Sequence, residues 1–258
     1  MSKWVTPAMA MASSTALVTA GCGVPIAKHG NRAATSKSGA ADVLSALGVN
    51  LDADFPLLEK ALREAGICFM MAPRHHGAMR HVGPARVEMG VRTIFNLLGP
   101  LVNPATPCWQ VMGVYAPEYT EPLARTLGLL GCEAALVVHG SGLDELALHG
   151  PSKGSLWKNG VLETVEFTPE EAGLERRELS ELAGGSPEDN AAWLRGFLAG
   201  EGSDAHNEAI ALNVGALLWV SGEFPDLKAA TGRALDAIRL GSAIERLDQL
   251  AARTSKGT

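Results

Sequence analysis

The chain has 258 residues, of which 47% are hydrophobic, 19% are charged and 5% are aromatic, and its net charge is −6. The hydrophobic share excludes an intrinsically disordered chain, and the negative charge disfavours a surface that attracts nucleic acid or anionic lipid as a whole. No run of 18 apolar residues occurs, so no membrane span is predicted. The four cysteines lie far apart without C-x-x-C spacing, which favours reduced thiols in a cytoplasmic protein over a zinc or thioredoxin-type site.

The first part of the chain is predicted to contain helices and short buried strands joined by polar loops. Residues 8–20, 40–47 and 57–65 have helical composition or spacing, and the apolar runs 24–27 and 67–72 are typical of buried strands. We interpret the apolar N-terminal stretch as part of the fold rather than a signal peptide, because polar residues interrupt it and it runs directly into a strand.

The middle of the chain is predicted to be parallel α/β. Residues 74–92 carry three histidines and four arginines among amphipathic helix signals, and the apolar stretch 91–101 contains Asn, Gly and Pro, which predict turns. Strands at 110–114 and 134–138 flank a helix at 121–130, and the second strand leads into a loop at 139–145. Ligands bind at such carboxyl ends of strands in open α/β sheets.

The C-terminal part is predicted to begin with a hairpin and continue as helices. Lys158-Asn159-Gly160 is a strong hairpin-turn signal between two apolar runs. From Ser186 onwards the spacing is helical. The expected helices cover approximately residues 187–199, 206–220, 226–239 and 242–252.

The polar loop 28–39 is a candidate anion site. It places two lysines, an arginine, a histidine, an asparagine and several hydroxyl groups after a strand and before a helix. Free amides at a helix start and charged donors both favour phosphate, so a phosphate or diphosphate is the natural partner. The alternative is a solvated loop with incidental charges, because the glycine spacing matches neither a Walker loop nor a Rossmann turn.

Two further groups of charged residues are candidate ligands. The adjacent carboxylates Asp144 and Glu145 suit Mg²⁺ shared with substrate phosphates, although an exposed acidic turn is the alternative. His75, His76 and His81 lack a known zinc-ligand spacing. With Arg74, Arg80 and Arg86 they instead suggest a cationic pocket for a carboxylate substrate, the alternative being a basic helix face. His139 is expected to order the loop at the end of its strand rather than to act as a base.

Several of these segments together resemble the anthranilate phosphoribosyltransferase family. Lys-His-Gly-Asn-Arg at 28–32 and Ser-Lys-Ser-Gly-Ala-Ala-Asp at 36–42 resemble the family's phosphoribosyl-binding loop. The long run at 90–104, with Arg-Thr-Ile-Phe-Asn-Leu-Leu-Gly-Pro at its centre, is highly specific. Further matches, in the expected order, are 69–73, His76, 78–79, Arg86, 139–145 and Asn213.

The resemblance implies an α/β fold with a mainly parallel sheet flanked by helices and a small helical domain. We therefore expect residues 1–258 to form a single glycosyltransferase-type α/β domain, with 74–104 as a helical segment of a reduced small domain. Family members are homodimers in tryptophan biosynthesis. They transfer the phosphoribosyl group of phosphoribosyl diphosphate (PRPP) to the amino group of anthranilate, with Mg²⁺, and release diphosphate.

The resemblance also implies site residues. Asn31 and Arg86 would face anthranilate, with His76 as a weaker candidate, and Asp144 and Glu145 would hold Mg²⁺. No catalytic base is expected, because the aniline nitrogen is neutral at pH 7. The residues implied for PRPP are Lys28, His29, Gly30, Asn31, Arg32, Ala33, Ala34, Thr35, Ser36 and Ala40. The basic and acidic groups are expected to converge on one diphosphate.

The sequence departs from the family pattern near its start. The family has a helical segment and a Gly-Thr-Gly-Gly-Asp loop before the point where this sequence begins. The family then has Asn-Ile-Ser-Thr, and the matching residues 10–13 of this sequence are Ala-Met-Ala-Ser. A shifted register would instead use Ser14 and Thr15. We therefore expect weakened PRPP binding and impaired activity. The alternatives are a non-catalytic paralogue that binds a ligand or partner, and a pyrimidine nucleoside phosphorylase, which the run at 92–104 disfavours.

Overall fold

The computed structural model describes residues 8–31, 40–77, 81–82, 88–89, 93–182 and 187–255. The strands are β1 (Ile26–Gly30), β2 (Ile67–Met71), β3 (Trp109–Gly113), β4 (Ala134–Gly140), β5 (Ser152–Lys158) and β6 (Val161–Phe167). The helices are α1 (Ala8–Gly21), α2 (Ala40–Ala46), α3 (Phe55–Ala65), α4 (Ala72–His75), α6 (Phe95–Leu101), α7 (Thr120–Leu129), α8 (Pro187–Gly196), α9 (Asp204–Val220), α10 (Leu227–Arg239) and α11 (Ile244–Thr254). Shorter helical turns are η1 (Pro117–Tyr119), η2 (Leu179–Leu182) and η3 (Phe197–Glu201).

The described strands form two sheets. β1 and β2 pair in parallel, with Ile26 opposite Ile67 and Gly30 opposite Met71. The second sheet has the order β3-β4-β5-β6, in which β3 and β4 are parallel and the other two pairings are antiparallel. The α/β fold class is confirmed. The expectation of a mainly parallel sheet holds only for the pairs β1–β2 and β3–β4, because β5 runs antiparallel to β4 and the predicted hairpin at Asn159 and Gly160, both with positive φ, adds β6 antiparallel to β5.

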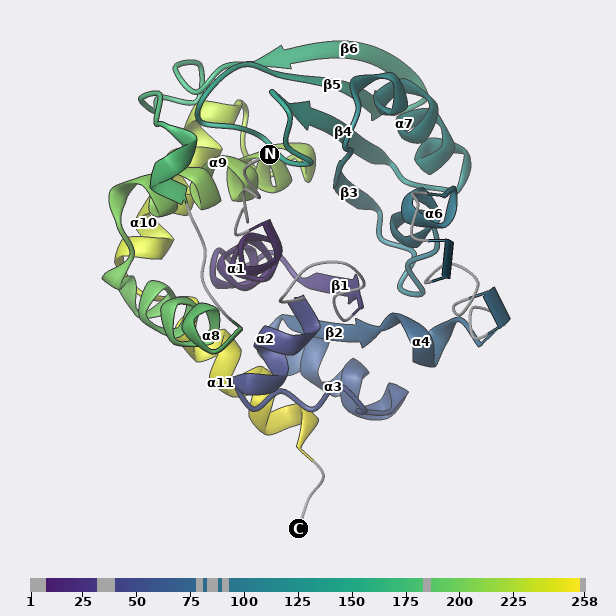
Figure 1. Ribbon diagram of the computed structural model, residues 1–258, viewed down its shortest axis with the longest axis vertical. Helices are drawn as coiled ribbons and strands as arrows, with labels where there is room; N and C mark the ends of the chain where they lie inside the picture. Colours follow the sequence, from purple (N-terminus) through teal and green to yellow (C-terminus); the bar gives the residue numbers. More distant parts are fainter. Residues whose placement is uncertain are drawn as a thin grey trace.

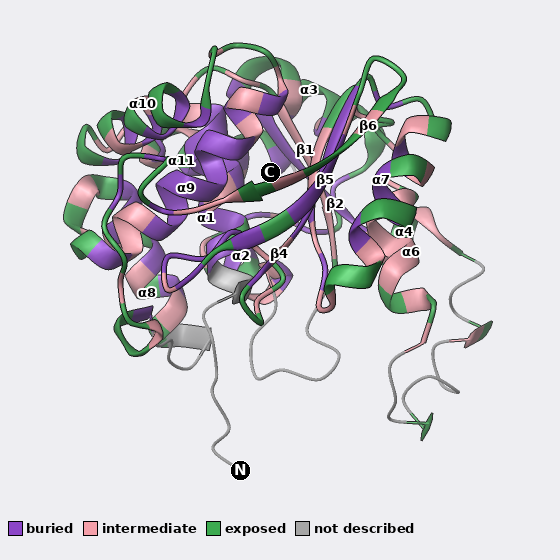
Figure 2. Cartoon of the chain, turned by 90° about the horizontal axis from the view of Figure 1, so that it is seen from above, coloured by how far each residue is buried: buried purple, intermediate pink, exposed green. Residues whose placement is uncertain are grey.

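Helix α1 lies in the middle of the molecule. Figure 1 shows it between α8, α9 and α10 on one side and β1 on the other, and it packs against α2 and α11 as well. Its residues Leu17 and Val18 have no exposed surface. Figure 2 shows that α9 is also largely buried, whereas exposed residues lie on the outer faces of α3, α7 and α10. The larger cluster of buried side chains therefore gathers around α1 and α9 and includes β2 and one face of β4, while a second cluster lies between α7 and the other face of β4.

Three predicted element boundaries are wrong. β1 begins at Ile26 and continues to Gly30, so Lys28 and His29 are strand residues, because pairing with β2 extends the ladder to Met71. β4 likewise runs on to Gly140, since His139 pairs with β5. The predicted turns around Gly99 and Pro100 form helix α6 instead, whose start is stabilised by the Asn96 side chain accepting from the Thr93 amide.

The predicted C-terminal helices are confirmed as α8, α9, α10 and α11. Asp226 caps α10 by accepting a hydrogen bond from the amide of Ala229 at 2.8 Å. Among the described residues, no helix is long and apolar enough to cross a membrane. Helices α9 and α10 pack closely where Gly215 faces Thr231: a Cβ on Gly215 would lie 2.9 Å from the backbone nitrogen of Thr231.

We predict opposite stability effects for two glycine-to-alanine changes, one at this contact and one on the exposed face of α10. Gly215→Ala should lower the free energy of unfolding by about 1–3 kcal/mol, because its methyl group would overlap Thr231 and push α10 away. Gly232→Ala, on the exposed face of α10 with open space around it, should raise the free energy by about 0.5–1 kcal/mol through helix propensity. Urea unfolding followed by circular dichroism measures both. Equal effects of the same sign would contradict the packing.

Candidate active site

The basic half of the candidate site is the end of strand β1. Lys28 is half-buried and forms no hydrogen bond or ion pair with a described residue. Burial lowers the pKa of Lys28 to about 8, because the surroundings solvate its ammonium group poorly. An anion bound here would stabilise the ammonium form of Lys28, so this strand end is suited to a phosphate.

The next residue, His29, connects β1 to two other segments. Its Nδ1 lies 3.2 Å from the carbonyl oxygen of Gly99, and its Nε2 lies 3.2 Å from Nε2 of His76. Because a carbonyl only accepts, Nδ1 of His29 carries the proton, and His76 donates from Nε2 to the bare Nε2 of His29. Burial and then the neighbouring His76 lower the pKa of His29, which favours this neutral pair.

Two of the three predicted histidines, His75 and His76, have different contacts. His76 lies beside the basic strand end, whereas the ring of His75 packs against Phe55 at a centroid distance of 4.9 Å. Arg74 forms an exposed ion pair with Asp52 at 3.4 Å, so its charge is shared with a carboxylate. Arg80 and Arg86 lie outside the described residues.

The acidic half of the site is the loop that follows β4. Asp144 is exposed and Glu145 is half-buried, and neither carboxylate forms a hydrogen bond or ion pair with a described residue. Burial, and then the charge of Asp144, raises the pKa of Glu145 to about 8. Glu145 therefore holds a proton at neutral pH when no cation is near, and a divalent cation would favour its ionised form.

Two glycines allow this loop to lie directly on the strands. A Cβ on Gly113, the last residue of β3, would overlap the backbone carbonyl of Asp144. A Cβ on Gly140 would overlap the carbonyl oxygen of Glu145 and lie 2.9 Å from the amide of Ala147. Only glycine allows the loop backbone to approach both strand ends this closely.

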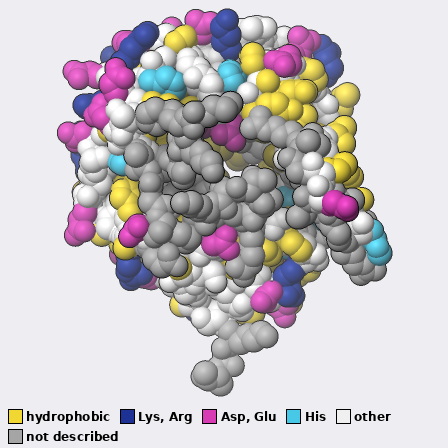
Figure 3. All heavy atoms as spheres, in the orientation of Figure 1, with side chains coloured by type: hydrophobic (Ala, Val, Ile, Leu, Met, Phe, Trp, Pro, Cys, Tyr) yellow, Lys and Arg dark blue, Asp and Glu magenta, His cyan; other side chains and the backbone are white. Residues whose placement is uncertain are grey.

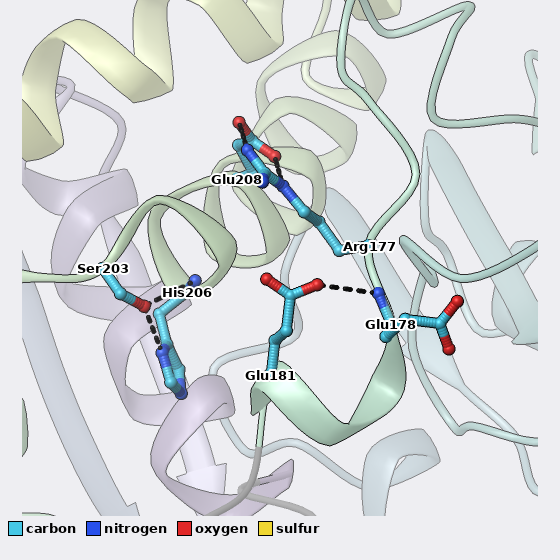
Figure 4. Close-up of polar contacts among 6 residues, drawn as sticks. All are labelled: Arg177, Glu178, Glu181, Ser203, His206 and Glu208. Carbon is cyan, nitrogen blue, oxygen red and sulfur yellow. Dashed lines mark hydrogen bonds and ion pairs between the residues drawn. The ribbon is translucent and has the colours of Figure 1, made fainter.

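Helix α9 holds the other side of the loop. Asn213 on α9 forms hydrogen bonds with both the amide and the carbonyl of Leu146, the residue after Glu145. Five residues earlier on α9, Glu208 forms a bidentate ion pair with Arg177 at 2.8 Å, drawn in Figure 4. The backbone amide of Arg177 donates to Leu148, so this pair also attaches the segment after the loop to α9.

Helix α6 connects the basic and acidic halves. It accepts a hydrogen bond from His29 of β1 through Gly99, and another from Gln110 of β3 through Pro100 at 2.9 Å. Shortly after α6, the Asn103 side chain donates to the carbonyl of Ala27 at 3.0 Å. The strand that carries Lys28 and the strand against which the acidic loop lies are therefore joined through one short segment.

The remaining predicted site residues are only partly described. Asn31 is exposed at the end of β1, and Ala40 begins α2. Arg32, Ala33, Ala34, Thr35, Ser36 and Arg86 lie outside the described residues. Of the residues aligned with the family's Asn-Ile-Ser-Thr, Ala12 is exposed, and Ser13 is buried with a hydroxyl group that has no partner among the described residues.

The acidic pair suits a magnesium ion that is shared with a substrate. Within the described residues, no group of three or more His, Cys, Asp or Glu could hold a metal ion, so the protein offers two carboxylates here. Mg²⁺ is commonly bound by one or two carboxylates together with water and substrate phosphates. On the face in Figure 3, basic and acidic side chains of the described residues are intermixed around the rim.

Comparisons with known proteins show the family to which the chain belongs. A family model described as "Glycosyl transferase family, a/b domain" matches residues 8–244. Anthranilate phosphoribosyltransferase of Sorangium cellulosum is 49% identical over 247 residues, which are 96% of this chain and 71% of that protein. The chain belongs to the anthranilate phosphoribosyltransferase family.

Solved structures of the family extend the likeness to three dimensions. The Thermus thermophilus anthranilate phosphoribosyltransferase is 44% identical and superposes with a TM-score of 0.88, covering 95% of this chain and 73% of that one. The Saccharomyces cerevisiae enzyme, solved in complex with PRPP and Mg, is 30% identical with a TM-score of 0.85, covering 96% of this chain and 70% of that one. This family membership and fold agree with the sequence-based resemblance.

The sequence did not predict the contacts that support the acidic loop. The approach of Gly113 to Asp144 and the ion pair of Arg177 with Glu208 join residues about 30 positions apart. A glycine at the end of an apolar strand is a weak signal for such a contact, since glycine there also ends strands. Asn213 carried a signal only through the family match, because an isolated asparagine in a helix has several ordinary roles.

We predict that Lys28→Met stabilises the ligand-free protein at pH 7. The methionine removes a poorly solvated ammonium group, so the free energy of unfolding should rise. Between pH 8 and 10.5 the unfolded chain still binds a proton at Lys28 that the folded chain has lost, so the free energy of unfolding of the unmodified protein rises with pH. The difference in this free energy between Lys28→Met and the unmodified protein therefore narrows as the pH rises. Urea unfolding at pH 7 and pH 9.5 measures this. The control is Lys60→Met on an exposed part of α3, and a difference independent of pH would contradict the interpretation.

Proposed function

We propose that this chain transfers the phosphoribosyl group of PRPP to the amino group of anthranilate and releases diphosphate, in tryptophan biosynthesis. The observation that carries the proposal is the pair of partly buried charges without partners among the described residues, Lys28 and Glu145. Each has a pKa displaced towards its neutral form. A diphosphate with a divalent cation supplies the opposite charge to both groups at once.

The chemistry of the reaction fits these two halves. As the bond between C1′ and the diphosphate oxygen breaks, positive charge grows on the ribose and negative charge on the leaving diphosphate. Lys28 would donate to the phosphate oxygens, and Asp144 and Glu145 would hold Mg²⁺, which would supply positive charge to the leaving diphosphate. The protein contributes mainly by binding and orienting the two substrates.

The acceptor needs orientation more than activation. The aniline nitrogen of anthranilate is neutral at pH 7, so its lone pair attacks C1′ directly and the ammonium that forms loses its proton to solvent. Asn31 faces anthranilate and Arg86 pairs with its carboxylate. His76, whose Nε2 lies 3.2 Å from Nε2 of His29, is the weaker candidate for contact with anthranilate. No catalytic base is assigned.

The names of the relatives support the substrates. The yeast structure is described as a complex with PRPP and Mg, and the curated relatives are named for phosphoribosyl transfer to anthranilate. We further propose a homodimer in the cytoplasm, and a single α/β domain in which residues 74–104 belong to a reduced small helical domain. Helices α4 and α6 lie within that segment.

A second candidate function is ligand binding without turnover. Where the family has Asn-Ile-Ser-Thr, Ala12 offers no polar side chain and the Ser13 hydroxyl is buried. Lost hydrogen bonds to a charged phosphate weaken binding by about 1.5–3 kcal/mol each, which is roughly 10- to 100-fold. A chain of this kind would bind diphosphate through Lys28 and the acidic pair yet position PRPP poorly.

An activity assay tests the proposal. With PRPP and Mg²⁺, anthranilate fluorescence should fall with time, and removal of Mg²⁺ with a chelator should abolish the decrease. Asp144→Asn and Glu145→Gln should each lower the rate by about 10- to 100-fold, because each removes a charged ligand. Glu163→Gln, an exposed carboxylate on β6, is the matched control and should retain the rate.

The outcomes separate the two candidate functions. Calorimetric binding of PRPP without loss of anthranilate would support the non-catalytic alternative. If PRPP does not bind and anthranilate fluorescence does not fall, the proposal is rejected for this chain.

A further inference from the structure

We propose that His139 and Asn213 are positioning residues that fix the loop 140–146 from its two ends, so that Asp144 and Glu145 present their carboxylates to the metal–diphosphate group. This inference rests on the proposed function, because it assumes that the acidic pair binds a divalent cation. Neither residue needs to touch substrate or metal. Each acts through the loop backbone, to which it is hydrogen bonded.

His139 fixes the start of the loop. Its Nδ1 lies 2.9 Å from the carbonyl oxygen of Val114, and its Nε2 lies 3.2 Å from the amide nitrogen of Gly142. The carbonyl can only accept and the amide can only donate, so Nδ1 carries the proton and Nε2 is bare. A neutral imidazole of this one tautomer satisfies both bonds, and it joins the residue after β3 to the loop two residues before Asp144.

Asn213 fixes the end of the loop. Its Oδ1 accepts from the amide of Leu146 at 3.0 Å, and its Nδ2 donates to the carbonyl of Leu146 at 3.1 Å and to that of Ala209 at 3.0 Å. The side chain is buried in an otherwise apolar part of α9, so its desolvation has to be offset by these three bonds. An amide is required, because a carboxylate could not donate to either carbonyl.

The two residues act on a loop that already has little freedom. Gly140 and Leu143 exchange two backbone hydrogen bonds of 3.0 Å, and the loop backbone lies against Gly113. Backbone rotation at Asp144 and Glu145 is therefore limited by the hydrogen bond from His139 to Gly142 on one side and by the two hydrogen bonds from Asn213 to Leu146 on the other. Backbone partners of this kind orient metal ligands, and their loss usually lowers metal affinity by about 10- to 100-fold.

The test measures binding of Mn²⁺ in the presence of inorganic diphosphate by electron paramagnetic resonance, with the melting temperature from circular dichroism measured in parallel. His139→Leu removes both hydrogen bonds, whereas His139→Gln can still accept from Gly142. We expect Mn²⁺ affinity to fall about tenfold or more in His139→Leu and to recover at least in part in His139→Gln. Asn213→Asp should also lose about tenfold, because its donors are gone.

Matched controls come from the start of the same helix. His206→Gln and Asn207→Asp make the same chemical changes at residues whose described hydrogen bonds go to Ser203 and Gly202 rather than to the loop. Their Mn²⁺ affinity should equal that of the unmodified chain. If His139→Leu fails to fold, His139→Asn takes its place. Asparagine keeps the donor to Val114 and loses the acceptor for Gly142, so it should bind Mn²⁺ more weakly than His139→Gln.

The variant Asp144→Asn distinguishes a failure of the proposed function from a failure of the positioning role of His139 and Asn213. If that variant binds Mn²⁺ with diphosphate as tightly as the unmodified chain, the metal assignment in the proposed function is wrong. If Asp144→Asn loses affinity while the His139 and Asn213 variants retain it, the positioning role is wrong and the proposed function stands. The positioning role would also be wrong if Mn²⁺ affinity fell in proportion to the melting temperature in the His139 and Asn213 variants and in the two control variants alike.

Discussion

The close backbone contact between the end of β3 and the loop after β4 is the constraint on which the acidic site depends. Gly113 leaves room for the carbonyl of Asp144, and Gly140 leaves room for that of Glu145. A side chain at either position would lift the loop from the sheet edge. Because the two acidic residues sit on backbone that is fixed in this way, their carboxylates can be placed with little loss of conformational entropy on ligand binding.

Without ligand, both halves of the site contain an ionisable group whose charged form is disfavoured by burial. Burial lowers the pKa of Lys28 and raises that of Glu145, each to about 8, so both groups are displaced towards their neutral forms. A bound diphosphate favours the ammonium form of Lys28, and a bound divalent cation favours the carboxylate form of Glu145. The protein is thus less stable without ligand than one with apolar residues at these positions, as is common at functional sites.

The sequence predicted elements whose signals are local and missed features that depend on distant partners. The helical spacing at 57–65 predicted α3 to within two residues, and Asn159-Gly160 predicted the hairpin, because helix periodicity and turn chemistry act over a few residues. The extent of β1 depended on β2, about 40 residues away, so Lys28 was assigned to a loop. The acidic pair was predicted as a candidate, yet the residues that support it, such as Asn213, lie 67 positions from their partners.

Helix α9 explains why the site and the core are not independent. The helix is apolar along most of its length, and its polar residues Asn213 and Glu208 bind Leu146, directly after the acidic pair, and Arg177, whose amide donates to Leu148. The same helix packs on α10 through Gly215, two residues beyond Asn213. A displacement of α10 at that contact would move Asn213, and with it the end of the loop. Packing between α9 and α10 therefore helps to set the geometry of the carboxylates.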